Sequence, residues 1–371
     1  MIWAWLLLAT SWFAYSYGFV DFNLTLSNNP LIVKVIGWGQ HLVFFDRPSS
    51  TLFYCLLLII TWGLYLVTIW KSKKWAYWKY GTLALLFGLA YPMLTHDIFN
   101  YLFHARIVVN YHANPHLLAP QVFVGDPWLR FMHWVHSPSA YGPVFTATML
   151  VPYLVGMTKL TTSLLAYKLL ACASYLLAIY LVGEIAKRNK LIDPNKARLL
   201  VALNPIILTE WLINAHNEVL MVTLMLLAWW MVGENKLWRG WSAIALSAGL
   251  KYAAILVAPA LLLWKFVGER WALWIAVLSL VITPFVYHFD FQYQIWYITW
   301  AIPFAIITGN RKLIAAILGY SIGGMLIYAP YIATGFWNLT PMTKILYLVS
   351  PAALMLIVES LLSINTHRKI S

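Results

Sequence analysis

The sequence has very little charge for its length of 371 residues. Charged side chains make up 10% of the residues and hydrophobic ones 62%, and acidic residues are the scarcest, with 12 Asp and Glu against 25 Lys and Arg. About a quarter of the residues of a typical soluble domain are charged, so this chain cannot cover a globule of its size with polar surface. Lipid is the remaining solvent. The composition therefore excludes an ordinary soluble protein and predicts one that lies in a lipid bilayer.

Three other features are missing. The chain has only two cysteines, Cys55 and Cys172, and both lie in apolar runs, so no structural disulfide is expected. It contains no HExxH motif or tight ligand cluster, so we expect no metal site and no cofactor, with a divalent metal as the less favoured alternative because histidines are frequent between residues 96 and 136. Its net charge of +13 comes from short clusters between apolar runs, which is how topology is encoded, so no nucleic-acid partner is expected.

Apolar runs recur along the whole chain. A helix needs about 20 apolar residues to span a bilayer, and the runs predict an all-α fold, a polytopic transmembrane bundle of about twelve spans. Basic clusters at residues 71–79 and 187–198 mark the cytoplasmic side and leave both termini inside. The first run is expected to be a retained span, because it lacks a basic start and a small-residue cleavage site. The predicted spans are residues 2–20, 52–70, 82–95, 163–184, 199–214, 219–232, 241–250, 252–264, 271–287, 293–307, 313–331 and 345–363.

One more apolar run, residues 141–157, does not fit this count. If it crossed the membrane, the strong basic cluster at 187–198 would lie outside. The run begins with Tyr141-Gly142-Pro143 and contains Pro152, which favours a juxtamembrane or re-entrant helix on the outer side. We therefore expect a large outer loop at residues 96–162 and three regions: two N-terminal spans with an outer loop (1–81), a core that includes the large loop (82–270) and C-terminal spans (271–371).

Ionisable residues near membrane depth are costly and are candidates for function. A helix that begins at Asp97 would place Asn100, Tyr101 and His104 on the same face as the carboxylate. A carboxylate with an aromatic ring and an imidazole beside it can act as a general base. The alternative is that Asp97 only caps this helix.

A second polar group lies at a tight outer turn, where His216, Asn217 and Glu218 follow an apolar run. Asn217 and Glu218 alternatively cap the next helix. Lys168 and Lys251 are isolated cations within apolar sequence, and a buried lysine needs an anionic partner, either a carboxylate such as Glu218 or a phosphate of a ligand. The alternative is that both lysines extend to the membrane surface.

The order of these motifs resembles a known family. The resemblance is to GT-C-fold glycosyltransferases, and within them to polyprenyl-phosphate-mannose-dependent mannosyltransferases and their bacterial relatives. It covers roughly residues 82–264, and the sequence departs from the family at His116, where an aromatic residue often stands, and at Glu218, where aspartate is common. The stretches that carry it are His96-Asp97, Tyr101, Arg106, Asn114-Pro115-His116, Asp126-Pro127, Tyr141-Gly142-Pro143, Asn204-Pro205, His216-Asn217-Glu218 and Gly249-Leu250-Lys251-Tyr252.

The resemblance implies roles for individual residues. Asp97 takes the place of the catalytic base, and Glu218 that of a second acid that orients the acceptor or the substrate. Lys168 and Lys251 take the places of cations that contact phosphate. The remaining residues of the expected substrate-binding site are Tyr101, His104, Arg106, Asn114, Tyr141, His216 and Asn217.

The resemblance further implies an inverting transfer of a hexose, with mannose favoured, from a polyprenyl-phosphate sugar to a glycan or lipid acceptor. The reaction would take place at the outer face of the cytoplasmic membrane, or in the lumen of the endoplasmic reticulum in a eukaryote. A transporter or flippase is one alternative, although no second repeat is visible. A lipid-linked glycan ligase or polymerase is another, although a diphosphate donor would favour arginines over these lysines.

Overall fold

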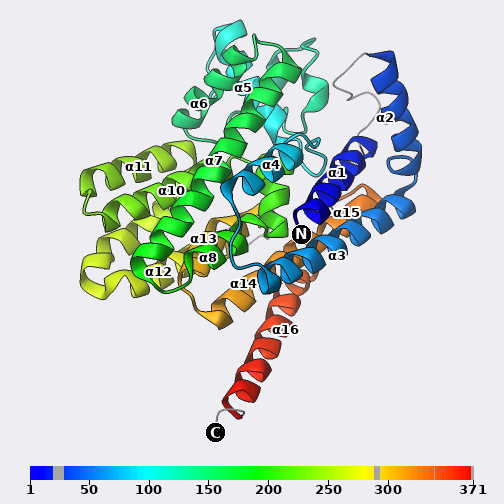
Figure 1. Ribbon diagram of the computed structural model, residues 1–371. Coiled ribbons are helices and arrows are strands. Elements are labelled where there is room, and N and C mark those ends of the chain that lie inside the picture. Colours follow the sequence, from blue (N-terminus) through cyan, green and yellow to red (C-terminus); the bar gives the residue numbers. More distant parts are fainter. Residues whose placement is uncertain (20–28, 288–292, 338, 369–371) are drawn as a thin grey trace. The chain divides into compact units, whose positions relative to one another are not determined.

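The computed structural model describes residues 1–19, 29–287, 293–337 and 339–368. Over these residues the protein is built from helices without strands, as the sequence predicts (Figure 1). The chain forms two compact units: unit 1 comprises Met1–Phe53, Trp75–Ala178 and Leu208–Ile255, and unit 2 comprises Tyr54–Lys74, Ile179–Ile207 and Leu256–Ser371. This interleaved division differs from the three successive regions expected from the sequence, which stay a prediction.

Unit 1 carries the residues singled out above. Within it, α5 packs on α6, α6 on α11, and α11 along α10, as Figure 1 also shows for the last pair. Helix α10 is apolar and largely buried, which is typical of a helix at the centre of a bundle. The elements that lie wholly in unit 1 are α1 (Ile2–Gly18), α2 (Pro30–Leu42), α4 (Tyr77–Gly88), α5 (Asp97–Tyr111), η2 (Pro120–Val122), η3 (Leu129–Phe131), α6 (Pro143–Val155), η4 (Leu208–Ile213), α10 (Glu218–Gly233) and α11 (Leu237–Leu250).

Three elements contribute residues to both units, namely α3 (Arg47–Lys71), α7 (Leu160–Asn189) and η5 (Tyr252–Val257). In unit 2, α14 packs closely along α16, because a side chain at Gly319 or Gly323 would overlap the backbone of α16. The elements of unit 2 alone are α8 (Pro194–Ala202), α9 (Pro205–Ile207), α12 (Ala258–Tyr287), η6 (Ile295–Tyr297), α13 (Ile298–Ile307), α14 (Arg311–Leu326), α15 (Tyr328–Thr334) and α16 (Pro341–Arg368).

The expected count of about twelve spans is not confirmed. Among the described residues, five helical stretches are long and apolar enough to cross a membrane, and a sixth is counted if a bent helix pair is one span. Several predicted spans form helices that are shorter than the roughly 20 residues needed to cross a bilayer: α4 has 12 residues and α11 has 14. Gly268, with φ of 79°, interrupts α12 between two of the predicted spans. The five stretches are Arg47–Lys71, Leu160–Asn189, Tyr252–Pro284, Arg311–Thr334 and Pro341–Ser363.

The apolar run at residues 141–157, which did not fit the predicted span count, forms a short helix. Helix α6 has 13 residues, about 20 Å at 1.5 Å per residue, which is less than the thickness of the hydrocarbon core. Phe145 and Met149 on one face are buried, whereas Val151 and Val155 are 61% and 70% exposed. Its length and its exposed apolar side chains favour the expected helix that lies at the membrane without crossing it.

The bent helix pair positions the second polar group. The helical segments Pro205–Ile213 and Glu218–Gly233 are together long and apolar enough to cross a membrane. They are separated by a short break in the helix, at which the chain bends by 114°. The first of them ends in η4, a π-helical turn, and Ala215 in the break has φ of 51°. π-Helical turns are frequent at functional sites, and irregular backbone at membrane depth is tolerated where protein covers it or where it lines a cavity.

Candidate active site

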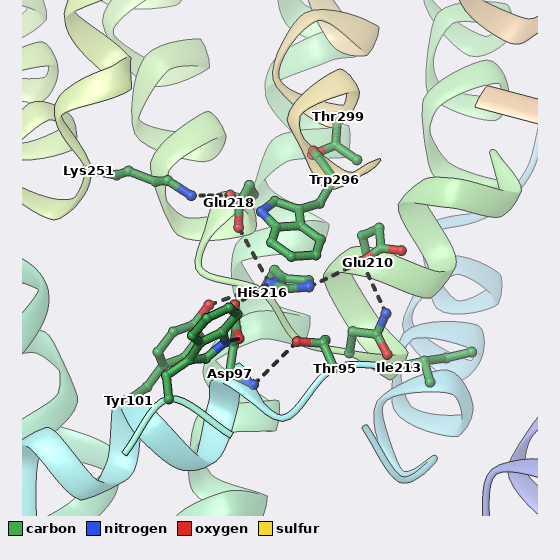
Figure 2. Close-up of polar contacts among 12 residues, drawn as sticks. Thr95, Asp97, Tyr101, Glu210, Ile213, His216, Glu218, Lys251, Trp296 and Thr299 are labelled. Carbon is green, nitrogen blue, oxygen red and sulfur yellow. Dashed lines mark hydrogen bonds and ion pairs between the residues drawn. The ribbon is translucent and has the colours of Figure 1, made fainter. Parts of the chain in front are cut away.

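A buried imidazole surrounded by three carboxylates lies at the centre of the site in unit 1. His216, in the break between η4 and α10, has its Nδ1 3.6 Å from Asp97 Oδ2 and 3.9 Å from Glu218 Oε2, and its Nε2 3.3 Å from Glu210 Oε2. Figure 2 shows these groups converging on the ring from three segments of the chain. In its protonated form His216 is an ion-pair partner for all three carboxylates, which is what allows them to be buried so close together.

Asp97 begins α5, as predicted, and its side chain is 8% exposed. Its Oδ1 accepts a hydrogen bond of 3.1 Å from the indole N–H of Trp134 in the outer loop. Its backbone N–H donates to Thr95 Oγ1, at 3.3 Å. The carboxylate therefore faces Trp134 and His216 instead of the N–H groups of its own helix, which disfavours a capping role.

Glu218 and Lys251 form an ion pair at the edge of the cluster. The Glu218 side chain is fully buried, whereas that of Lys251 is 18% exposed. The Lys251 ammonium also lies 5.8 Å from the ring centroid of Tyr141. Figure 2 shows Glu218 between Lys251 and His216. Of the partners that the sequence left open for Lys251, a carboxylate or a phosphate, the structure shows the carboxylate Glu218.

The end of the outer loop is fixed directly to the segment that carries Lys251. The N–H of Gly142 donates to Leu250 O at 3.0 Å. A Cβ atom at Gly142 would overlap the carbonyl of Gly249, so only glycine allows this approach. Tyr141, which precedes it, therefore lies beside Lys251 and packs edge-on against Tyr101 at 5.1 Å.

Glu210 is the member of the cluster that the sequence analysis did not assign to the site. It lies in η4 and is fully buried, and it accepts a hydrogen bond of 3.0 Å from Asn214 Nδ2. The backbone N–H of His216 donates to Glu210 O at 2.9 Å. Its signal in the sequence was an acidic residue inside an apolar run, six positions before His216.

Lys168 does not join the cluster. Its ammonium donates to the backbone oxygens of Ala90, Leu212 and Ile213, at 2.5, 3.2 and 2.6 Å. These carbonyls account for the buried charge without a phosphate, and they tie η4 to the segment that precedes α5. The structure therefore gives Lys168 a structural role, and its contact with phosphate stays a prediction without support from this geometry.

Several buried polar groups near the cluster have no hydrogen-bond partner among the described residues. They include both amide atoms of Asn217, Asn100 Oδ1 and the hydroxyl of Tyr167, whose ring packs at 5.9 Å against that of Tyr101. Asn217 is 1% exposed and its side chain does not cap α10, so the capping alternative for this residue is wrong. Buried polar atoms are almost always satisfied by protein, water or ligand, so these atoms have hydrogen-bonding capacity for water or a ligand.

The other predicted substrate-binding residues lie in the outer loop and its helix. The Arg106 guanidinium forms an ion pair with Asp126, at 2.5 Å, and stacks on Trp128 at 4.7 Å. Burial alone would raise the pKa of Asp126, but hydrogen bonds from Tyr111, the N–H of Trp128 and Arg106 outweigh it and lower that pKa. Arg106 therefore holds the loop together and does not contact Asp97.

Asn114 has a local role as well. Its Oδ1 accepts a hydrogen bond of 2.9 Å from the N–H of His116, which forms a turn directly after α5. Asn114 is exposed, so the structure does not bring it to the acid cluster. Its predicted contact with substrate stays a prediction.

Two histidines of the loop region lie within the fold, His96 half-buried and His104 buried. His96 stacks on His133 with ring centroids 4.1 Å apart, and burial, together with the neighbouring His133, lowers the pKa of His96 to about 4. His104 is 4% exposed with both ring nitrogens unpaired, and burial and the nearby His116 lower its pKa to about 4. Within the described part of the chain, no group of three or more His, Cys, Asp or Glu residues has a geometry that could hold a metal ion.

The comparisons with known proteins identify the family. Neither the search of curated proteins nor that of solved structures finds a significant match. A family model, described as the N-terminal domain of alpha-(1->6)-mannopyranosyltransferase, matches residues 24–268. The match covers most of the chain and includes every residue of the acid cluster, and it ends where Gly268 interrupts α12. The chain therefore belongs to the alpha-(1->6)-mannopyranosyltransferase family.

Proposed function

We propose that this membrane mannosyltransferase moves mannose from a polyprenyl-phosphate donor to the primary hydroxyl of a mannose in a glycan or lipid-linked acceptor. The linkage formed is α-(1→6), and the reaction takes place at the outer face of the cytoplasmic membrane. The observation that carries this proposal is Asp97, a buried carboxylate that accepts an indole N–H bond and lies 3.6 Å from an imidazole.

In the proposed reaction Asp97 is the general base. Its Oδ2 accepts the proton of the acceptor hydroxyl while the acceptor oxygen forms a bond to the anomeric carbon and the bond from that carbon to the phosphate oxygen breaks. A single displacement inverts the anomeric carbon, so an α-linked product requires a β-linked donor. A positioned base of this kind contributes about 10²–10⁴-fold to the rate. His216, 3.6 Å away, stabilises the carboxylate before the transfer.

Lys251 is the cation proposed to meet the departing phosphate. It is the partly exposed member of its ion pair, and Glu218 keeps it in place in the absence of donor. When the bond to the anomeric carbon breaks, negative charge increases on the phosphate oxygens, and a fixed ammonium stabilises this charge without reorganisation. Asn217 and Tyr167, whose buried polar atoms lack partners, are proposed to bind sugar hydroxyls.

Transporters also build binding sites from bent or broken helices, such as the pair bent by 114° here. Two observations favour transfer over transport. The chain belongs to a family of transferases, and Asp97 is held by Trp134 of a folded outer loop, which suits a fixed reaction geometry.

The test is a transfer assay in proteoliposomes, with radiolabelled polyprenyl-phosphate mannose and a mannose oligosaccharide. Wild type should incorporate mannose in α-(1→6) linkage, and Asp97→Asn should lose about 10²-fold or more of kcat. Asp46→Asn is the matched control, because Asp46 caps α3 through Ser49 and asparagine caps equally well. Lys251→Met should raise the KM for the donor more than that for the acceptor. The proposal is wrong if wild type transfers no mannose, and the role of the base is wrong if Asp97→Asn retains turnover.

A further inference from the structure

Two helices of unit 1 that take no part in the acid cluster, α1 and α2, enclose an apolar cavity of about 620 Å³. This volume is typical of ligand sites. Apart from Tyr17 and Thr161, all of its lining residues are apolar or glycine. The side chains that form most of the walls are Phe13 and Ala14 of α1 and Leu31, Ile32, Val35 and Trp38 of α2.

Close packing of backbone closes one side of this cavity. A Cβ atom at Gly39 of α2 would lie 3.3 Å from the Cα of Gly18 in α1, so the two helices cross without side chains between them. On the other side the walls present exposed hydrocarbon: Leu31 is 71%, Val35 62% and Trp38 71% exposed. Exposed apolar surface of this extent is typical of a binding surface or a lipid contact.

The cavity adjoins the segment that leads into the active site. Tyr17, one of its lining residues, packs on Tyr91 with ring centroids 5.8 Å apart, and its hydroxyl donates to Leu89 O at 3.4 Å. Tyr91 in turn packs at 6.0 Å against Phe99, which follows Asp97 by two residues on α5. Packed aromatic rings therefore connect Tyr17 in the wall of the cavity to the helix that carries the proposed base.

The same segment is fixed from its other side by the polar core. Lys168 donates to Ala90 O and also to Ile213 O at the end of η4. Residues 89–91 thus separate an apolar cavity from a polar, carboxylate-lined site within a single compact unit. A molecule with a polar head and a long hydrocarbon chain has the chemistry to occupy both.

We propose that the cavity between α1 and α2 binds the isoprenoid tail of the lipid-phosphate donor. This inference rests on the proposed function and adds a second binding site to it. Helix α1 lies before residue 24, where the match to the family model begins, whereas α2 lies within the matched residues, so the site combines a helix outside that match with one inside it. Binding of the tail contributes to donor affinity through buried hydrocarbon area and leaves the chemistry at Asp97 unchanged.

The first test uses chain length. Ala14→Trp fills the cavity, and Ala4→Trp is the matched control, because Ala4 is an exposed alanine on the same helix that does not line the cavity. With an undecaprenyl donor, Ala14→Trp should raise KM about tenfold, which corresponds to about 1.4 kcal/mol. With a geranyl donor, whose chain is too short to fill the cavity, KM and kcat should stay at the wild-type values. Equal effects on both donors, or no effect on either, would overturn the proposal.

The second test needs neither transfer nor a variant. A polyprenyl phosphate that carries a diazirine at the far end of its chain, without a sugar, is photoactivated with the wild-type protein in nanodiscs. Labelling should concentrate on peptides of α1 and α2 over those of α16, where Leu354 and Ile357 are 59% and 58% exposed and report contact with ordinary lipid. Equal labelling of these peptides would show lipid contact only and refute the site. Concentrated labelling without any mannose transfer would instead refute the proposed function and leave the prenyl site standing.

Discussion

Acidification should loosen the outer-loop helix α5, because it carries a buried histidine without a hydrogen-bond partner. His104 is 4% exposed, and burial lowers its pKa to about 4, whereas an unfolded histidine has a pKa of about 6.5. Between these two values the opened state binds more protons than the folded state. The contribution of neutral His104 to the free energy of opening of α5 is therefore fully present above pH 6.5 and is lost as the pH falls towards 4. At pH 5 the loss is about 2 kcal/mol, since each pH unit below 6.5 is worth about 1.36 kcal/mol.

The assay is hydrogen exchange of α5 peptides, read by mass spectrometry in nanodiscs at pH 7.5 and pH 5.0 after correction for intrinsic exchange rates. The free energy of opening of α5 should fall in wild type by at least the contribution of His104, about 2 kcal/mol. In His104→Phe the fall should be smaller by this amount, because the variant has no ring nitrogen to protonate at this position. The part that remains is the contribution of His96 before α5, whose pKa is also lowered to about 4. His41→Phe, at an exposed histidine of α2, should keep the wild-type slope.

The reasoning would be refuted if His104→Phe kept the full pH dependence of wild type. The variant also separates two roles of His104. At pH 7.5 it should be at least as stable as wild type, because it no longer buries two ring nitrogens without partners. A rise in the acceptor KM of a stably folded His104→Phe would support the predicted contact of His104 with substrate.

Trp134→Phe should lower kcat about tenfold or more, because it removes a hydrogen bond to the Asp97 carboxylate, and a hydrogen bond to a charged group is worth about 1.5–3 kcal/mol. Trp128→Phe in the same loop is the control in the same kinetic assay. Lys168→Met should lower the thermal midpoint and leave the donor KM unchanged, since three buried carbonyls lose their donor; an unchanged midpoint with a raised donor KM would contradict the structural role. A cysteine at Val151, which is 61% exposed on α6, should react with an impermeant maleimide only from outside the cell, and labelling from the cytoplasm would contradict the outer position of α6.

The part of the site that follows an apolar run could be predicted from the sequence. Asp97 stands at the end of such a run, and the spacing of Asn100, Tyr101 and His104 predicted a helix that begins there, as α5 does. All four side chains are buried, as are the residues between them, because the first two turns of α5 are covered by protein on every face. Glu218 was one of the partners expected for Lys251, because few carboxylates are available in so apolar a chain.

The other parts depend on backbone geometry that no periodicity reveals. Glu210 and His216 are six positions apart, and in a regular α-helix they would point to different faces. The π-helical turn η4 and the left-handed Ala215 bring them together. Lys168 was assigned to phosphate because a sequence does not show which backbone carbonyls a fold leaves without partners. The span count stays unconfirmed because hydropathy does not distinguish a crossing helix from a short one such as α4.

The backbone contact between Gly142 and Leu250 has a consequence for how the enzyme responds to its substrates. The last residues of the outer loop and the segment with the ammonium of Lys251 must shift as one piece, because no side chain between them can absorb a displacement. An acceptor that moves this loop would thus reposition the cation that is proposed to meet the donor. Replacing the loop with that of a relative would require exchanging the end of α11 along with it.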